Sequence, residues 1–297
     1  MSYNNAYLPK ICIIFIISIF AILGLVAFIL HFTQNKSCNY EKYKNYDKNA
    51  IVVLTRGYKT KNKYKKLLTR NKHLEKYFNR NISYIIFHEG NIATEHQKYI
   101  QNKTKIPLQF INVKDSFNFD NTIKFDPDTR DFNLGYRNMC NFWFSEFWKY
   151  VDGYDKILRI DEDCNYMSDY NIIFEQLDNK VSIYGHYQND GGNHCTKGLN
   201  KFTQNFLKMS GFDNIKSRTP SGPYTNVIGF NVNKLKTNDL LFEYIKAVKE
   251  SNNIYIYRWG DLPLWGEALY YFFKTDDHLL LNTIKYFHES HGRMING

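Results

Sequence analysis

Lys156-Ile-Leu-Arg-Ile-Asp-Glu-Asp163 is the stretch that decides the fold, because an apolar segment leads directly into three acidic residues. The segment Lys156–Ile160 predicts a buried β-strand. Asp161 and Asp163 follow it at alternate positions, which share a face where the backbone is extended. Two carboxylates at a strand end offer the oxygen ligands that Mg²⁺ or Mn²⁺ prefers. The same spacing also arises by chance, so an exposed acidic turn is the alternative interpretation.

Short β-rich segments alternate with helical ones on both sides of this strand. Strands are predicted at 50–54, 82–88, 108–113, 156–160, 181–187 and 227–232, and helices at 60–78, 136–150, 238–251 and 261–273. Strands separated by helices favour an α/β fold with a mainly parallel central sheet. Ligands of such folds bind at the carboxyl ends of strands. Arg56, His88, Glu89 and the acidic run all fall at such ends.

Residues 11–32 read ICIIFIISIFAILGLVAFILHF, an apolar run of about 22 residues. A helix of this length rises about 33 Å and crosses a bilayer core. The apolar part of a cleaved signal peptide is usually about 7–15 residues long, so a permanent transmembrane anchor is the preferred interpretation. The predicted organisation is a cytoplasmic tail at 1–10, the anchor at 11–32, a polar stem at 33–48 and one globular domain at 49–297.

The composition is that of a globular chain, with 43% hydrophobic and 17% aromatic residues and a net charge of +10. The lysines are scattered and no nucleic-acid-binding module accompanies them, so a solvated basic face is expected rather than a nucleic-acid partner. A positive field still favours an anionic ligand. The five cysteines form no CxxC pair, which argues against a zinc site of that type. Whether these cysteines form disulfides stays open, because their spacing does not reveal which of them pair.

Two further motifs flank the acidic run. Tyr136-Arg-Asn-Met-Cys-Asn-Phe142 lies on the predicted helix before the strand, and Arg258-Trp-Gly-Asp-Leu-Pro-Leu-Trp265 opens a helix. Asp261 precedes Pro263, which places it near the N-terminus of that helix. An amphipathic core helix and a capped helix start are the alternative interpretations of these two motifs.

With these motifs in this order, the chain resembles the fungal Golgi α-1,2-mannosyltransferase family from about residue 50 to 290. The family pattern is YRHMCRF, then RVEPD, then a glycine-containing strand, then RWGDAPVHS and a histidine. The corresponding segments here are Tyr136–Phe142, Arg159–Asp163, Val227-Ile-Gly229, Arg258–Pro263 and His288. The resemblance implies a GT-A type Rossmann-like glycosyltransferase domain at 49–297, a GDP-mannose donor, Mn²⁺ (or Mg²⁺) and retention of anomeric configuration. It also implies a type II membrane protein of Golgi or ER-type membranes, with its catalytic domain in the lumen.

The resemblance also assigns roles to individual residues. Asp161 takes the place of the family's metal-binding glutamate, Asp163 that of the final acid of the motif, and His288 that of the second metal ligand. Asp163 and Asp261 are the candidate catalytic residues, with Asp261 matching the RWGD aspartate as an acceptor contact or base. The candidate donor-binding residues are Arg56, Tyr136, Arg137 and Arg159.

The chain departs from the family at two positions. Glu162 stands in place of a proline and is a further candidate metal ligand. Val227 aligns with a glutamate proposed to act on the far face of the sugar, with Asn226 beside it. Valine neither attacks nor stabilises an oxocarbenium ion. The possibilities are therefore same-face attack assisted by the donor phosphate, a different carboxylate, or an inactive protein.

Together these features predict a membrane-anchored, metal-dependent glycosyltransferase that moves a sugar from a nucleotide-sugar donor to a glycan or glycoprotein acceptor. A catalytically inactive membrane protein with the same fold, which binds a glycan or a partner, is the first alternative. A different metal-dependent nucleotidyl or phosphoryl enzyme is the second.

Overall fold

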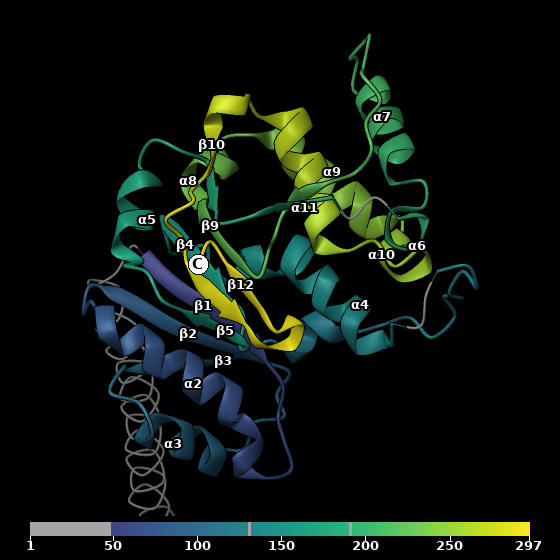
Figure 1. The fold of residues 1–297 in the computed structure, drawn as a ribbon. Helices are drawn as coiled ribbons and strands as arrows, with labels where there is room; N and C mark the ends of the chain where they lie inside the picture. Colours follow the sequence, from purple (N-terminus) through teal and green to yellow (C-terminus); the bar gives the residue numbers. More distant parts are fainter. Residues whose placement is uncertain (1–48, 130–131, 190–191) are drawn as a thin grey trace, which may run out of the picture. The chain divides into compact units, whose positions relative to one another are not determined.

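The computed structural model describes residues 49–129, 132–189 and 192–297, and a seven-stranded β-sheet forms its centre (Figure 1). The strand order is β10-β6-β9-β4-β1-β2-β3. The strands are β1 (Asn49–Thr55), β2 (Ile82–His88), β3 (Leu108–Asn112), β4 (Lys156–Ile160), β6 (Ser182–Tyr184), β9 (Val227–Asn231) and β10 (His278–Leu280). β9 is antiparallel to both neighbours, whereas the other adjacent pairs are parallel. The predicted mainly parallel sheet is therefore confirmed.

Helices cover both faces of this sheet (Figure 1). They are α2 (Lys65–Leu74), α3 (Thr94–Asn102), α4 (Leu134–Asn141), α5 (Asn171–Gln176), α6 (Asn193–Thr196), α7 (Leu199–Met209), α8 (Val232–Lys236), α9 (Asp239–Glu250), α10 (Asn253–Ile256) and α11 (Asp261–Phe272). Adjacent residues of β1 serve opposite faces, as strand geometry requires. Val53 packs with Leu67 of α2, whereas Val52 packs with the aromatic core that includes Trp265 of α11. A sheet covered on both faces explains the nearly continuous apolar runs of β1 and β2.

The helix predicted at 136–150 is present but irregular. It consists of α4, a π-helical turn over Phe142–Glu146 and a 3₁₀ turn over Phe147–Tyr150. Phe142, Trp143 and Phe144 are three consecutive aromatic residues and all are buried. The change of helix type coincides with this run, and π-helical turns inside helices are frequent at functional sites.

The strand predicted at 181–187 is interrupted. β6 ends at Tyr184, and the next residue, Gly185, lies so close to Ile284 that a Cβ there would be 2.6 Å from the Ile284 side chain. The chain then forms β7 (Tyr187–Gln188), which pairs with β8 (Gly222–Pro223). Periodicity does not reveal such a close approach, because it depends on a residue almost one hundred positions away.

A three-stranded antiparallel sheet was not predicted. It consists of β5 (Cys164–Tyr166), β11 (Tyr286–His288) and β12 (Arg293–Ile295), in the order β12-β11-β5. Each strand has three residues, too few for an alternating pattern to be recognised. This sheet joins the segment after the acidic run to the segment that carries His288, and it places Cys164 directly opposite His288.

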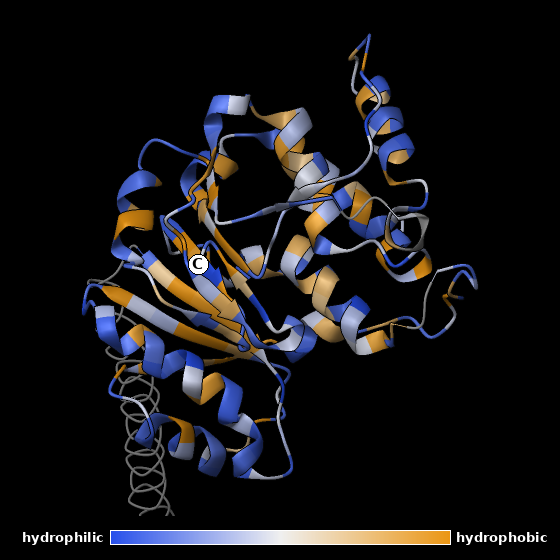
Figure 2. Cartoon of the chain, viewed as in Figure 1, coloured by the Kyte–Doolittle hydropathy of each residue, from blue (hydrophilic) through white to orange (hydrophobic). Residues whose placement is uncertain are grey.

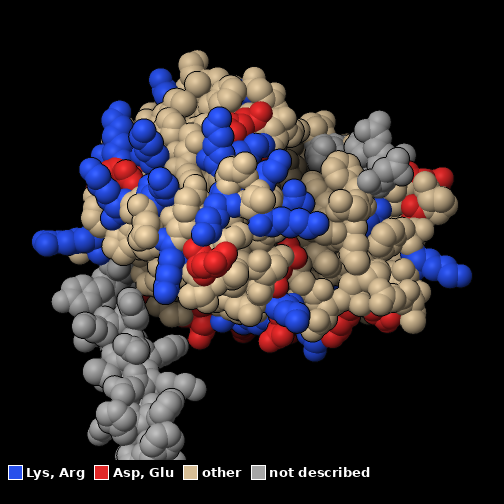
Figure 3. Space-filling model, turned by 90° about the horizontal axis from the view of Figure 1, so that it is seen from below, with Lys and Arg blue, Asp and Glu red and all other residues tan. Residues whose placement is uncertain are grey.

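Apolar residues concentrate in the central strands, and the surrounding helices are mixed (Figure 2). Lys and Arg residues are spread over the face seen in Figure 3, with some Asp and Glu among them. Lys59, Lys61, Lys63 and Lys65 are exposed, in keeping with a solvated basic face. Within the part of the chain that the structure describes, none of the helices is long and apolar enough to span a bilayer. The predicted tail, anchor and stem lie outside the described residues.

Candidate active site

The carboxyl ends of β1, β2 and β4 meet at one edge of the sheet because these strands are parallel. A cleft of about 470 Å³ opens at this edge. Its walls include Thr55, Arg56, Glu89, Tyr136 and Glu162. Clefts at this edge are the usual ligand sites of open α/β sheets. Two residues singled out as donor contacts, Arg56 and Tyr136, therefore face one cavity.

Glu162 contributes a carboxylate to the wall of this cleft. One oxygen accepts a hydrogen bond from the Thr55 hydroxyl, and the other accepts one of 2.8 Å from the Tyr58 hydroxyl. Burial, and secondly the charge of Glu162, raise the pKa of Tyr58 to about 12, so the phenol keeps its proton at neutral pH. Glu162 was a further candidate metal ligand. In the structure each of its oxygens is hydrogen-bonded to a hydroxyl group close to the end of β1.

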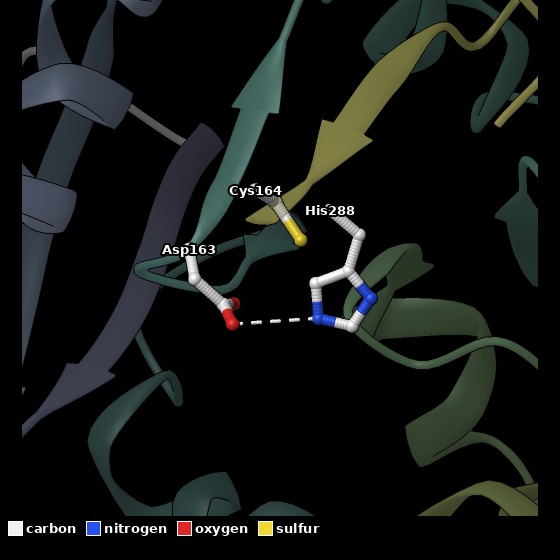
Figure 4. Close-up of side chains that lie close together, drawn as sticks. All are labelled: Asp163, Cys164 and His288. Carbon is white, nitrogen blue, oxygen red and sulfur yellow. Dashed lines mark ion pairs between the residues drawn. The ribbon is translucent and has the colours of Figure 1, made fainter. Parts of the chain in front are cut away.

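Asp163 and His288 face each other at the junction of β5 and β11 (Figure 4). Oδ2 of Asp163 lies 3.4 Å from Nε2 of His288 and also accepts a hydrogen bond from Ser290. Burial opposes ionisation, but the contacts with His288 and Ser290 outweigh it and lower the pKa of Asp163 to about 2. The carboxylate is therefore charged at neutral pH, as a metal ligand must be. Sγ of Cys164 completes a group whose ligand atoms lie within 4.8 Å of one another.

The imidazole of His288 is held from its other side. Nδ1 lies 2.9 Å from the Tyr224 hydroxyl and 3.0 Å from the side-chain amide of Asn226. Asn226 is fixed in turn by a hydrogen bond of 2.9 Å from the Tyr286 hydroxyl. Outer contacts of this kind orient metal-binding histidines, and here they direct Nε2 towards Asp163. A charged carboxylate beside an oriented imidazole fits a divalent ion such as Mn²⁺.

The acidic run is a turn, so the extended backbone on which a shared face of Asp161 and Asp163 depended is absent. The amide of Cys164 donates to the Asp161 carbonyl at 3.1 Å, which closes a four-residue turn. The two carboxylates have different partners. Asp163 faces His288, whereas Asp161 accepts hydrogen bonds of 2.8 and 3.0 Å from Arg159. The predicted metal group thus contains Asp163 and His288, and the structure does not add Asp161 to it.

Arg159 connects two sequence motifs. Besides its two bonds to Asp161, its guanidinium forms an ion pair with Asp261 and packs 4.3 Å above the Trp143 ring. Arg159 is only 4% exposed. Arg159 was predicted to bind the donor. Its guanidinium instead binds two carboxylates of the protein, and the residue does not line the cleft. Its bonds to Asp161 and Asp261 make it a positioning residue for the acidic turn.

Asp261 begins α11, as the Pro263 signal predicted. Its Oδ2 pairs with Arg159, and its Oδ1 lies 3.7 Å from the Cys140 thiol. The helix N-terminus adds a favourable field for this charge. Both oxygens have partners within the protein and the residue is only 5% exposed, so Asp261 offers little surface to an acceptor. Asp261 links three motifs in one buried cluster: Cys140 of α4, Arg159 of β4 and the start of α11.

Tyr136 and Arg137 are the two residues of α4 that were predicted to line the donor site, and the structure places their side chains differently. Tyr136 lines the cleft, whereas Arg137 is buried and donates to the carbonyls of Phe132 and Tyr255. Neighbouring helix positions point in different directions, so both cannot face one cavity. Arg258 stacks on the cleft wall instead, 3.7 Å from the Phe132 ring centre and 4.9 Å from that of Tyr136. Its φ of 55° is uncommon for a residue with a side chain.

Val227 is fully buried and pairs with Ile160 across β4 and β9. Its side chain belongs to the apolar core that includes Ile160 and Leu158. The neighbouring Asn226 points instead to His288. No carboxylate of β9 (Val227–Asn231) is therefore available to the site.

Sequence reasoning missed four residues of the site. Tyr58, Cys164, Tyr224 and Ser290 carry no motif of their own, and their roles depend on contacts between distant segments. Tyr58 has one local signal, because it follows β1 at the edge where Arg56 was already expected to bind a ligand.

Neither a protein-family model nor a curated protein matches this sequence. Solved structures do share the fold. Core-mannan synthase A (CmsA/Ktr4) from Aspergillus fumigatus, in its Mn/GDP form, is 16% identical over 80% of this chain and 74% of that chain, with a TM-score of 0.68. The mannosyltransferase Ktr4p from S. cerevisiae, in complex with GDP, is 17% identical over 82% of this chain and 71% of that chain, also with a TM-score of 0.68. At this level of identity the likeness establishes the fold, which is the mixed α/β, GT-A-like architecture predicted from the sequence.

Proposed function

We propose that this chain is a metal-dependent glycosyltransferase that moves a sugar from a nucleotide-sugar donor to a glycan or glycoprotein acceptor. The observation that carries the proposal is the arrangement at the carboxyl edge of the sheet. The cleft lined by Arg56 and Tyr136 ends at Glu162, and the next residue, Asp163, faces His288. In this proposal the diphosphate of a nucleotide bound in the cleft would reach past Glu162 to the carboxylate–imidazole pair.

GDP-mannose is the donor we favour. The two proteins of the same fold were solved with GDP, one of them with Mn as well. In this chain the exposed guanidinium of Arg56 is available to the anionic nucleotide. Asp163 and His288 would hold Mn²⁺ or Mg²⁺. Such an ion offsets the negative charge of the departing nucleoside diphosphate.

The proposed reaction retains the configuration of the sugar without a protein nucleophile. Val227 is buried, and Asp261 is bound to Arg159 and Cys140. The acceptor hydroxyl oxygen forms the bond to the anomeric carbon on the face from which the diphosphate departs. The carbon–oxygen bond to the diphosphate breaks with its electron pair, and a phosphate oxygen takes the hydroxyl proton.

The proposal includes a membrane-anchored, lumenal enzyme of Golgi or ER-type membranes. Its basis is the apolar run at 11–32 together with the predicted glycoprotein or glycan acceptor. This orientation is tested by protease protection of the domain in intact microsomes.

The test of the activity uses the full chain in detergent. Release of nucleoside diphosphate and transfer of sugar to mannosides are measured with a panel of nucleotide sugars and Mn²⁺. We expect GDP release from GDP-mannose that is lost with a chelator and in Asp163→Ala. Asp152→Ala is the matched control, because the Asp152 side chain is 80% exposed on the surface. A folded protein that turns over none of the nucleotide sugars contradicts the proposal.

A second function is favoured by the burial of Val227. Without a far-face carboxylate, the same cleft serves a non-catalytic protein that binds a nucleotide sugar or glycan. Calorimetry separates the two functions: binding of GDP-mannose without GDP release or sugar transfer indicates the binding protein.

A further inference from the structure

Cys164 is a thiol inside the group that we propose to hold the metal ion. Its register opposite His288 in the antiparallel β5–β11 pair puts the two side chains on the same face of the small sheet. Figure 4 shows the Cys164 sulfur and the Asp163 carboxylate next to the same edge of the His288 ring. All three ligand atoms lie within 4.8 Å of one another.

The spacing of the other two ligand atoms fits an ion between them. Two ligands about 2.1 Å from a tetrahedral ion lie about 3.4 Å apart, and Asp163 Oδ2 and His288 Nε2 are 3.4 Å apart. A sulfur ligand at about 2.3 Å lies about 3.6 Å from its neighbours in the same geometry. The distance from the Cys164 sulfur to each of the other two ligand atoms therefore has to shorten by at most about 1.2 Å.

We propose that Cys164 is the third protein ligand of this ion and that the site consequently selects thiophilic divalent ions, Zn²⁺ and Co²⁺, over Mn²⁺ and Mg²⁺. On binding, the ion forms a bond to the sulfur and the thiol proton passes to solvent. Soft thiolate ligands favour such ions, whereas carboxylate and water ligands favour Mg²⁺ and Mn²⁺. This inference rests on the proposed metal site of the transferase and concerns the relative affinity of that site for different divalent ions.

An ion would reach the cluster from the Asp163 side, and it would have to displace the proton of a thiol whose pKa burial and the charges of Asp161 and Asp163 raise. Cys164 itself is 0% exposed, whereas the Asp163 side chain is 16% exposed and provides the way in for an ion. The sequence argued against zinc because the chain contains no CxxC pair. The absence of a CxxC pair does not exclude this cluster, because its three residues come from the acidic turn, β5 and β11 and form no spacing motif.

Cobalt is the probe, because a thiolate bound to Co²⁺ produces a charge-transfer absorption that oxygen and nitrogen ligands do not. The full chain in detergent is titrated with Co²⁺, and Zn²⁺ and Mn²⁺ are then added as competitors. We expect the band in the wild type and its loss in Cys164→Ser. The preference for Zn²⁺ over Mn²⁺ should fall at least about tenfold in this variant. Comparing the ratio removes the general advantage of Zn²⁺ at any such site.

Cys140→Ser is the matched control. Cys140 is also a buried thiol beside a carboxylate, 3.7 Å from Asp261, but it is outside the cluster with His288. This variant should keep the band. If Cys164→Ser does not fold, Cys164→Val replaces it, because valine suits the apolar core around this position.

Cobalt binding without the band, no cobalt binding at all, or a band that survives in Cys164→Ser or Cys164→Val overturns the proposal. These outcomes are separate from the transfer assay. Sugar transfer without a thiolate band removes this inference and leaves the proposed function. A thiolate band in a protein that transfers no sugar supports this inference and removes the proposed function.

Discussion

Arg159 in β4 and Asp261 at the start of α11 form a buried ion pair, although 102 positions separate them in the sequence. Asp161 binds the same guanidinium. The pair therefore fastens the acidic turn after β4 to the N-terminus of α11. It relates two motifs that the sequence shows only as separate short patterns.

Removing one partner of this pair should lower the free energy of unfolding. Arg159→Met leaves two carboxylates without their cation, and loss of one member of a buried pair costs about 3–5 kcal/mol. We expect a decrease of that size in the free energy of unfolding, measured with urea. Lys246→Met is the control, because the Lys246–Glu250 pair is exposed on both sides and such pairs contribute less than about 1 kcal/mol. An equal effect of the two substitutions would refute this account of Arg159.

The ionisation of Asp163 should make the free energy of unfolding depend on pH in the acid range. Its pKa is about 2 in the folded protein against an ordinary value of 3.8. The contribution of the charged form is complete above about pH 4 and disappears as pH falls through the folded pKa of about 2. We expect wild type to exceed Asp163→Asn by about 2 kcal/mol at pH 6 and by about half of that at pH 3. Urea unfolding at several pH values measures this, with the exposed Asp128→Asn as a control that should show no such trend.

Val227→Glu should destabilise the protein rather than supply a missing catalytic group. The side chain at this position enters the apolar core between β4 and α5, and a buried, unpaired charge there costs more than about 4 kcal/mol. Val227→Ile, which stays apolar, should cost less than about 3 kcal/mol. Thermal unfolding and the transfer assay measure both. A folded Val227→Glu enzyme with faster transfer would show that this position does face the sugar.

Arg56 should contribute to donor affinity and not to folding. It is exposed at the mouth of the cleft, and a hydrogen bond to a charged group contributes about 1.5–3 kcal/mol. Arg56→Ala is therefore expected to raise the dissociation constant of GDP at least about tenfold, measured by calorimetry, with an unchanged unfolding midpoint. Lys59→Ala, an exposed cation of the same segment, provides the comparison. Equal losses of affinity would point to a general field effect instead.

Gly266 should not tolerate a side chain. It packs in α11 against the segment before β8, where a Cβ would lie 1.7 Å from the Ser221 carbonyl oxygen. Gly266→Ala should therefore destabilise the protein by about 1–3 kcal/mol or more, because the clash is with backbone. At Gly153 a Cβ meets nothing within 4 Å, and Gly153→Ala should be close to neutral. Differential scanning calorimetry compares the two variants.

Much of the fold was readable in the sequence because its elements are long enough to show a period. β1, β2 and β4 were placed within a residue of their ends, and α11 begins at Asp261 as Pro263 indicated. The position of the cleft followed from parallel strands ending at one edge. These features depend on local pattern and on general rules of sheet topology.

The finer arrangement of the site depended on contacts that no local pattern encodes. Asp161 and Asp163 were expected on one face of an extended segment, but the backbone turns there, and the two side chains have different partners. Arg159 was expected to bind the donor, yet two carboxylates of the protein occupy it. The pairing of β5 with β11 involves strands of three residues, and it alone brings Cys164 to His288.

That pairing has a consequence for how the protein acquires its ion. Asp163 and Ser290 are 127 positions apart, and contacts over such separations form slowly because a long loop must close first. The pairs β1–β2 and β2–β3 need far shorter loops, so the sheet edge can exist before its metal group does. A chain caught between these stages would have a cleft but no ion affinity. Uptake of cobalt followed in real time would then mark the last step of folding, and a bound ion would stabilise only chains that have completed it.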